Sequence, residues 1–151
     1  MKQAYIEAFR LLERVHRQFL EVIKAELDRV GVQDINNVQA LILFNIADDE
    51  LTVGELTNRG YYLGSNVSYN VRKMVENGYL EQQRSTHDRR SIRVKLSAKG
   101  LKLSEDMAAF FDKHAKALKD SPITENDLKV TSDAMRKMER FWGNIISYSP
   151  F

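Results

Sequence analysis

Polar side chains that can form hydrogen bonds gather at the start of one segment in the middle of the chain. They are Ser65, Asn66, Ser68, Tyr69 and Asn70. Hydroxyl and amide groups of this size can form hydrogen bonds with the edges of DNA bases. Asn66 or Asn70 could pair bidentately with an adenine, a contact worth about 1–3 kcal/mol of discrimination between bases. This segment is therefore a candidate for reading DNA sequence.

Basic side chains continue the pattern further along the same segment. Arg72 and Lys73 lie where contacts with phosphates are expected, and such contacts add affinity without sequence information.

A second charged cluster lies at the predicted tip of a β-hairpin. It consists of His87, Asp88, Arg89 and Arg90. Arg89 and Arg90 could reach a narrow A/T-rich minor groove, where the negative potential is highest. Asp88 would orient a neighbouring arginine, so that less entropy is lost on binding. His87 could contact a phosphate.

The helix that carries the polar face is predicted over residues 65–77. Its apolar residues recur at i, i+4, i+7 and i+8, which places them on one side of a helix. They are Val67, Val71, Met74 and Val75. Gly78 is expected to end this helix.

A shorter helix and a turn are predicted before it. Thr52 and Glu55 have the spacing of a capping box, so we expect a helix that begins there, buries Leu56 and ends near Gly60. Residues 60–64 would form the turn. Helix, turn and helix would then lie together, with the polar face of the second helix outward.

Two strands are predicted after the second helix, over residues 79–84 and 91–96. The second strand is the clearer one, because Ile92, Val94 and Leu96 alternate with Arg93 and Lys95. One face of this hairpin should pack on the helices and the other should be basic.

Long amphipathic helices are predicted at both ends of the chain. Residues 3–30 carry an apolar stripe and should stop at Gly31, and Asn36 or Asn37 should cap a second helix that extends to about Ala47. Its inward residues would be Val38, Leu41, Ile42 and Ile46. Ser97 and Thr124 should cap the last two helices.

Positive charge is concentrated on the predicted helix-turn-helix and hairpin. Residues 52–102 contain ten basic and four acidic residues, a net charge of +6, whereas the whole chain has a net charge of +2. The remaining residues therefore carry −4. Such segregation is typical of proteins that bind a polyanion.

Several other classes of protein are disfavoured by the composition. The chain has no cysteine, and His16, His87 and His114 are not in a metal-ligand spacing, so we expect no disulfide, metal or cofactor. No catalytic motif is present, so we do not expect an enzyme. No apolar run approaches the ~20 residues that cross a bilayer, and no signal peptide is recognised, so we expect a cytoplasmic protein without membrane contact.

The same residues resemble a known family, the MarR-type transcriptional regulators. The segment from Glu55-Leu56 to Gly78-Tyr79-Leu80 is similar to the family's Glu-Leu-Ala and recognition helix ending in Gly-Leu-Val. Residues 88–100, from Asp88-Arg89-Arg90 to Leu96-Ser97-Ala98-Lys99-Gly100, resemble its Asp-x-Arg and Leu-Thr-x-x-Gly. The resemblance by motif covers about half of the chain.

This resemblance implies a mainly α fold with a small β-hairpin wing. It implies a winged helix-turn-helix DNA-binding region over residues 36–100 and helical dimerisation regions over 1–35 and 101–151, within one compact chain. A homodimer would bind a pseudo-palindromic site in double-stranded DNA, most often as a repressor. Arg90 would enter the minor groove, braced by Asp88. A small aromatic or anionic effector would release the DNA, at residues that one sequence does not assign.

Two alternatives to this interpretation remain open. One is a winged-helix module that recruits a protein partner and binds DNA weakly or not at all. The other is an architectural regulator that binds DNA without any effector.

Overall fold

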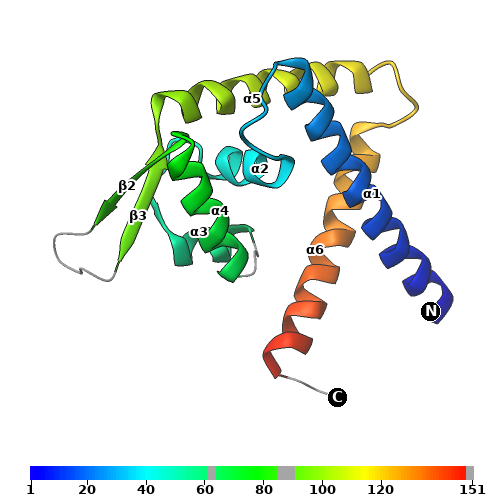
Figure 1. Cartoon of the computed structure of the whole chain (residues 1–151). Coiled ribbons are helices and arrows are strands. Elements are labelled where there is room, and N and C mark those ends of the chain that lie inside the picture. The colour runs from blue at the N-terminus through cyan, green and yellow to red at the C-terminus, as the bar shows by residue number, and fades with distance from the viewer. Residues whose placement is uncertain (61–63, 85–90, 149–151) are drawn as a thin grey trace. The chain divides into compact units, whose positions relative to one another are not determined.

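The computed structural model describes residues 1–60, 64–84 and 91–148, and these residues form six helices and three short strands (Figure 1). The helices are α1 (Lys2–Arg29), α2 (Asn37–Ile46), α3 (Val53–Gly60), α4 (Gly64–Glu76), α5 (Ala98–Leu118) and α6 (Glu125–Tyr148). The strands are β1 (Leu51–Thr52), β2 (Leu80–Arg84) and β3 (Ile92–Leu96). This is the mainly α fold with a small β wing that the sequence predicts.

Two compact units make up the chain. Unit 1 comprises residues 1–110 and unit 2 comprises residues 111–151. Unit 1 contains the helix-turn-helix and all three described strands.

Reciprocal side-chain caps fix where α2 and α3 begin. The Asn36 side chain accepts a hydrogen bond from the backbone N–H of Gln39 at 2.8 Å, and the Gln39 side chain accepts from the backbone N–H of Asn36 at 3.0 Å. Thr52 and Glu55 form the same pair at α3, with distances of 3.1 Å and 2.7 Å. Two otherwise unsatisfied N–H groups are paired at each helix start. Asn36 is therefore the cap of α2, and the predicted box at Thr52 is confirmed.

The two glycines that were predicted to end α1 and α4 adopt the same backbone geometry. Gly31 and Gly78 have φ of +74° and +79°. The N–H after each glycine bonds back to the helix, from Val32 to the Leu27 carbonyl and from Tyr79 to the Met74 carbonyl. These bonds are those of a Schellman motif, which satisfies the last carbonyls of the helix. The chain thus leaves α4 in a fixed direction and enters β2.

The core of unit 1 is built around α2. This helix packs against α1, α3, α4 and β3, so it is covered on several sides. Its buried residues are Gln39, Ala40, Ile42, Leu43 and Ile46. Val38 and Leu41, which were predicted to point inward, are only half-buried. The predicted inward positions of Ile42 and Ile46 are confirmed, since both are buried. Ala40 and Leu43 are buried as well, because a helix that is apolar all round buries more than one face.

The three strands form one antiparallel sheet in the order β1–β3–β2. Leu80 pairs with Leu96, and Leu51 of β1 pairs with Val94. Val94 is 0% exposed and Leu96 is 7% exposed, so the predicted apolar face of β3 does pack inward. Strand β1 was not predicted. It joins the wing directly to the start of α3.

Both terminal helices carry large apolar side chains that are exposed within their own units. On α1 these include Tyr5, Phe9, Leu11, Val15, Phe19 and Val22. On α6 they include Leu128, Val130, Met135, Phe141, Ile146 and Tyr148. Among the described residues of α6, none is buried. No described helix is apolar over a length that could cross a membrane.

Candidate nucleic-acid interface

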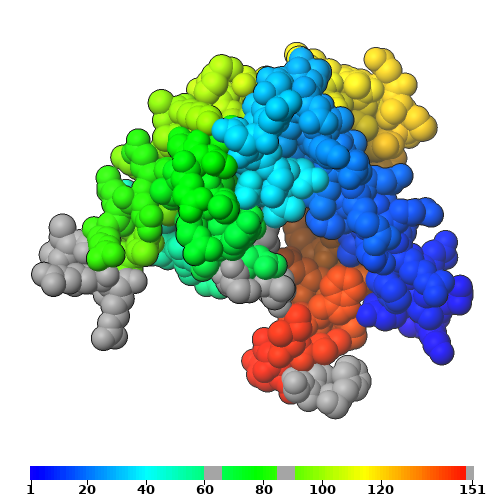
Figure 2. All heavy atoms as spheres, viewed as in Figure 1, coloured from blue at the N-terminus to red at the C-terminus, as the bar shows by residue number. Residues whose placement is uncertain are grey.

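Helix α4 separates a buried apolar face from an exposed polar one. Val67, Val71 and Met74 are at most 5% exposed, and they hold the helix against the core. The exposed residues include Asn66, Ser68, Tyr69 and Arg72. Figure 2 shows the side chains of α4, in green, on an open face of unit 1 between α2 and the strands. The predicted polar face is therefore accessible to a large partner such as a DNA groove.

Tyr69 and Arg72 are in contact on this exposed face. The guanidinium carbon of Arg72 lies 5.8 Å from the centroid of the Tyr69 ring, within the range of a cation–π interaction. Such a contact restricts the conformations of the Arg72 side chain even when no phosphate is bound. Lys73 is different, because its ammonium group pairs with Glu76 at 3.0 Å in the same helix. We expect Lys73 to contribute less to the attraction of DNA than Arg72 does.

Asn70 lies on the flank of α4 that faces α2. Its side-chain oxygen accepts a hydrogen bond from the side-chain nitrogen of Gln39 at 3.1 Å, and it is half-buried. Sequence reasoning missed Gln39, whose side chain is 6% exposed and links the start of α2 to α4. The capping-box spacing from Asn36 to Gln39 was the one signal that could have placed it at the start of α2.

The candidate residues of the wing tip are outside the described ranges. His87, Asp88, Arg89 and Arg90 belong to the segment 85–90, and the side chain of Ser65 is likewise not described. Their assignment stays a prediction.

The strands that lead to the tip present charged side chains outward. Arg84 and Arg93 are exposed, and Lys95 pairs across the strands with Glu81 at 3.5 Å. Arg93 also acts electrostatically on Glu55, whose pKa is lowered chiefly because its carboxylate accepts the backbone N–H of Thr52. Arg93 and Lys95 thus make the outward face of β3 basic, and part of this charge is neutralised by Glu55 and Glu81. Arg84 is paired with Ile92 and therefore lies on the other face of the sheet.

Helix α3 is fixed at its end as well as at its start. Arg59 donates to the Asp49 carboxylate at 2.6 Å and to the Asn45 carbonyl at 3.2 Å. These bonds connect the last turn of α3 to the last turn of α2 and to the segment that follows it. The first helix of the helix-turn-helix is therefore anchored at both ends.

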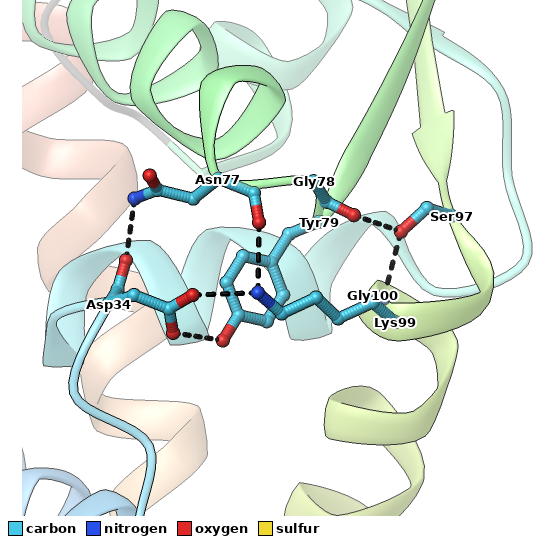
Figure 3. Close-up of polar contacts among 7 residues, drawn as sticks. All are labelled: Asp34, Asn77, Gly78, Tyr79, Ser97, Lys99 and Gly100. Atoms are coloured by element: carbon cyan, nitrogen blue, oxygen red, sulfur yellow. Dashed lines mark hydrogen bonds and ion pairs between the residues drawn. The ribbon is translucent and has the colours of Figure 1, made fainter.

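A polar cluster ties α4 and the strands to the rest of unit 1 (Figure 3). We call it the Asp34 junction, and it comprises Asp34, Asn77, Gly78, Tyr79, Ser97, Lys99 and Gly100. The Asp34 carboxylate accepts from the Tyr79 hydroxyl at 2.5 Å and from the Lys99 ammonium at 2.6 Å. Lys99 also donates to the Asn77 carbonyl at 2.9 Å and lies 4.2 Å from the centroid of the Tyr79 ring. The segment between α1 and α2 is thereby linked to the end of α4 and the start of α5.

These contacts shift the pKa values of two groups in the junction. The hydrogen bond from Lys99, followed by that from Tyr79, lowers the pKa of the Asp34 carboxyl below its usual value. Burial and the hydrogen bond to Asp34 raise the pKa of the Tyr79 hydroxyl. The charged carboxylate and the neutral phenol are therefore the forms that the fold favours.

The start of α5 is packed directly on the backbone of Gly78 and Tyr79, between α4 and β2. The Ser97 hydroxyl caps the helix by accepting from the Gly100 N–H at 3.1 Å, and it donates to the Gly78 carbonyl at 2.6 Å. The Ser97 N–H donates to the Tyr79 carbonyl at 3.0 Å. A side chain at Gly100 would meet that same carbonyl oxygen at 2.2 Å. The predicted cap at Ser97 is confirmed, and glycine is required three residues later.

No group of side chains that could hold a metal ion is found in the parts of the chain that the structure describes. Within residues 1–60, 64–84 and 91–148, no three histidine, cysteine or acidic side chains are grouped as ligands for a metal ion.

Comparison with known proteins identifies relatives of the same kind. The family model described as MarR family matches residues 33–91. The exopolysaccharide II synthesis transcriptional activator ExpG of Rhizobium meliloti (strain 1021) is 35% identical over 144 residues, covering 95% of this chain and 74% of the relative.

Solved structures of low sequence identity share the fold. Streptococcus pneumoniae FabT in complex with DNA has a TM-score of 0.75 at 18% identity, covering 93% of this chain and 99% of that one. Staphylococcus aureus MarR in complex with salicylate and kanamycin has a TM-score of 0.75 at 21% identity, covering 93% of each chain. The matched family model, the 35% identical relative and the shared winged helix-turn-helix fold lead to one conclusion: the chain belongs to the MarR family of transcriptional regulators.

Proposed function

We propose that this protein is a homodimeric, sequence-specific DNA-binding regulator whose α4 enters the major groove. The exposed polar face of α4, backed by the buried residues Val67, Val71 and Met74, is the observation that carries the proposal. A major groove about 12 Å wide admits one helix, and base edges would meet the first turns of α4. Asn66 would contact a base there, and Arg72 would contact a phosphate. Membership of a family of regulators agrees with the expectation that the chain is not an enzyme.

A second copy of the chain is the partner that the terminal helices favour. Exposed side chains such as Phe9 on α1 and Phe141 on α6, at 36% and 51% exposure, would lose contact with water in a dimer. Two copies related by a two-fold axis would present two α4 helices to a pseudo-palindromic site. The regions 1–35 and 101–151 are proposed to form this interface around the DNA-binding region 36–100.

The wing tip is proposed to contact the minor groove beside each α4. Arg90 and Arg89 would enter it, with Asp88 as an orienting partner and His87 near a phosphate. Exposed cations on both strands, Arg84 at the end of β2 and Arg93 on the outward face of β3, support this direction of approach.

Release by a small effector is part of the proposal. The structure of Staphylococcus aureus MarR contains salicylate, an aromatic anion, and this supports an effector of the same chemistry here. Repression is the commoner outcome in the family, but ExpG is a transcriptional activator. The likeness to ExpG favours activation for this chain. A reporter gene placed behind the selected binding site would decide the sign of regulation.

Selection of bound DNA from a random pool tests the proposal, followed by titration of the selected duplex at several salt concentrations. Each phosphate contact adds about 0.9 to the slope of log affinity against log salt. Arg72→Ala should reduce that slope by about 0.9 per protomer and weaken binding to all sequences. Lys129→Ala is the matched control, since it removes an exposed cation of α6 that pairs with Glu125. It should leave the slope unchanged.

Asn66→Ala should instead relax base preference, by about 1–3 kcal/mol at the contacted position. If the wild-type protein binds no selected duplex, the winged helix serves a protein partner, and the proposal is refuted. If it binds DNA but salicylate and related aromatic acids change neither its melting temperature nor its DNA affinity, the effector is removed from the proposal.

A further inference from the structure

Two hydrogen bonds link the backbone of Asn36 to the side chain of Gln39, and Gln39 to the side chain of Asn70. The backbone N–H at the start of this chain fixes which group donates and which accepts in each bond. The backbone N–H of Asn36 donates to the side-chain oxygen of Gln39 at 3.0 Å. The side-chain nitrogen of Gln39 donates to the side-chain oxygen of Asn70 at 3.1 Å. Gln39 is 6% exposed, so these partners replace water for its amide group.

The direction of these bonds follows from the chemistry of the groups. The oxygen and nitrogen of an amide side chain are assigned from their hydrogen-bond network. A backbone N–H can only donate, so the oxygen of Gln39 must face Asn36. The side-chain nitrogen of Gln39 then faces α4. Because this nitrogen donates, Asn70 must accept the hydrogen bond with its side-chain oxygen. Asn70 is left with its NH₂ group, which has two donors and no acceptor.

The remaining NH₂ group of Asn70 lies at the edge of the exposed face of α4. Asn70 is half-buried, and it follows the exposed Asn66 by one helical turn. Within the described part of the chain, the hydrogen bond of the Asn70 side chain is the one that its oxygen accepts from Gln39, and its nitrogen donates to no protein group. A group with donors alone fits a phosphate oxygen, or the base acceptors of guanine or thymine. It does not fit bidentate pairing with adenine, which needs an acceptor as well.

We propose that Gln39 is a positioning residue for DNA recognition, which orients the Asn70 amide so that its NH₂ group, and not its oxygen, faces the DNA. This inference rests on the proposed function, because it specifies how one residue of the α4 face meets its partner. It replaces the adenine contact predicted for Asn70 and leaves that role to Asn66. Gln39 itself contacts no DNA.

The substitution Gln39→Glu separates this role from a purely structural one. A carboxylate at this position still accepts from the Asn36 N–H, and glutamate is a preferred residue of the capping box. It cannot donate to the Asn70 oxygen. The Asn70 amide should therefore turn, donate to the new carboxylate and present its oxygen to the DNA. The assays are made at pH 8 to keep the carboxylate ionised.

The expected result is a loss of affinity for the selected duplex of roughly 10-fold, the scale of one hydrogen bond to a charged group. The preferred base should also change if the NH₂ group contacts a base edge. In protein without DNA, the Asn70 side-chain NH₂ signals should move in the ¹H–¹⁵N spectrum, and Asn70→Ala identifies those signals by their loss. Gln33→Glu is the matched control, because it adds the same charge on an exposed residue in the connection between α1 and α2.

A double substitution shows whether Gln39 acts through Asn70. In the Asn70→Ala background, Gln39→Glu should have no further effect on DNA affinity. An equal loss in both backgrounds would mean that the added charge acts directly, and this would overturn the inference. So would wild-type affinity and base preference in the Gln39→Glu single variant, with the wild-type protein binding as proposed.

Two further outcomes are informative. If Gln39→Glu does not fold, Asn70→Asp makes the same test, since its carboxylate accepts from Gln39 but offers no N–H; wild-type affinity in that variant overturns the inference. If the wild-type protein binds no DNA sequence at all, the proposed function fails and the inference fails with it. The two failures are therefore distinguished by the behaviour of the wild-type protein.

Discussion

Replacing Gly100 with alanine tests whether α5 is locked to the start of the wing. A Cβ atom at this position would lie 2.2 Å from the carbonyl oxygen of Tyr79 and 3.2 Å from its carbon. Close carbon–oxygen contacts in proteins are about 3.3 Å or longer, so the two segments must separate by about 1 Å. The obstacle is backbone, and it is held by the hydrogen bond from the Ser97 N–H at 3.0 Å. No side-chain rotation can relieve the contact.

The size of the effect follows from three contributions. Overpacking of a filled site costs about 1–3 kcal/mol. Loss of the Ser97–Tyr79 hydrogen bond costs about 0.5–1.5 kcal/mol. The better helix propensity of alanine returns up to about 1 kcal/mol. We therefore expect Gly100→Ala to reduce the free energy of unfolding by roughly 0.5–4.5 kcal/mol.

Urea unfolding at one fixed protein concentration measures this change, because the stability of a dimer depends on concentration. Gly54→Ala is the control. Gly54 is an exposed residue of α3, and its nearest non-neighbouring atom, the Thr52 hydroxyl oxygen, would be 3.9 Å from the new Cβ. This variant should be at least as stable as the wild type. Equal stability of Gly100→Ala and the wild type would refute the direct packing of α5 on the Tyr79 carbonyl.

Three other substitutions test the caps and the Asp34 junction. Gly78→Ala should cost about 1 kcal/mol in urea unfolding, since φ of +79° is unfavourable for a residue with a Cβ. Thr52→Ala should cost about 1 kcal/mol in the same assay, because α3 loses the side-chain half of its capping box. The third substitution, Asp34→Asn, tests how the stability of the fold depends on pH. The lowered pKa of Asp34 means that its carboxylate stabilises the fold above its ordinary pKa of 3.8, and this stabilisation is lost as pH falls through the folded-state value. The melting temperature of the variant should therefore depend less on pH in that acidic range than the melting temperature of the wild type does. An equal dependence in both proteins would show that the Asp34 junction does not contribute to the loss of stability in acid.

Local signals predicted most of the helix and strand boundaries. Thr52 with Glu55 marked the start of α3, and Gly78 marked the end of α4, because caps depend on residues close together in the sequence. The alternation in residues 92–96 predicted β3 for the same reason. The polar face of α4 followed from helical geometry alone.

Features that depend on distant partners were not predicted. Strand β1 has two residues, too few for any alternation, and exists because Leu51 and Thr52 pair with β3. Asp34 has polar and charged partners 43 to 65 residues away, at Asn77, Tyr79 and Lys99. The link from Gln39 to Asn70 spans 31 residues and joins two helices. Periodicity within one element carries no information about such contacts.

The pairing of β1 with β3 limits how the wing can change during evolution. Thr52 lies opposite Arg93 in the sheet and is also the cap of α3. Deleting one residue from β3 would turn Val94 and Leu96 toward solvent, and it would also pull the cap of α3 out of place. Substitutions on the outward side of the strands meet no such obstacle. Relatives of this protein should therefore acquire new DNA preferences by exchanging outward side chains, while the lengths of the strands stay constant.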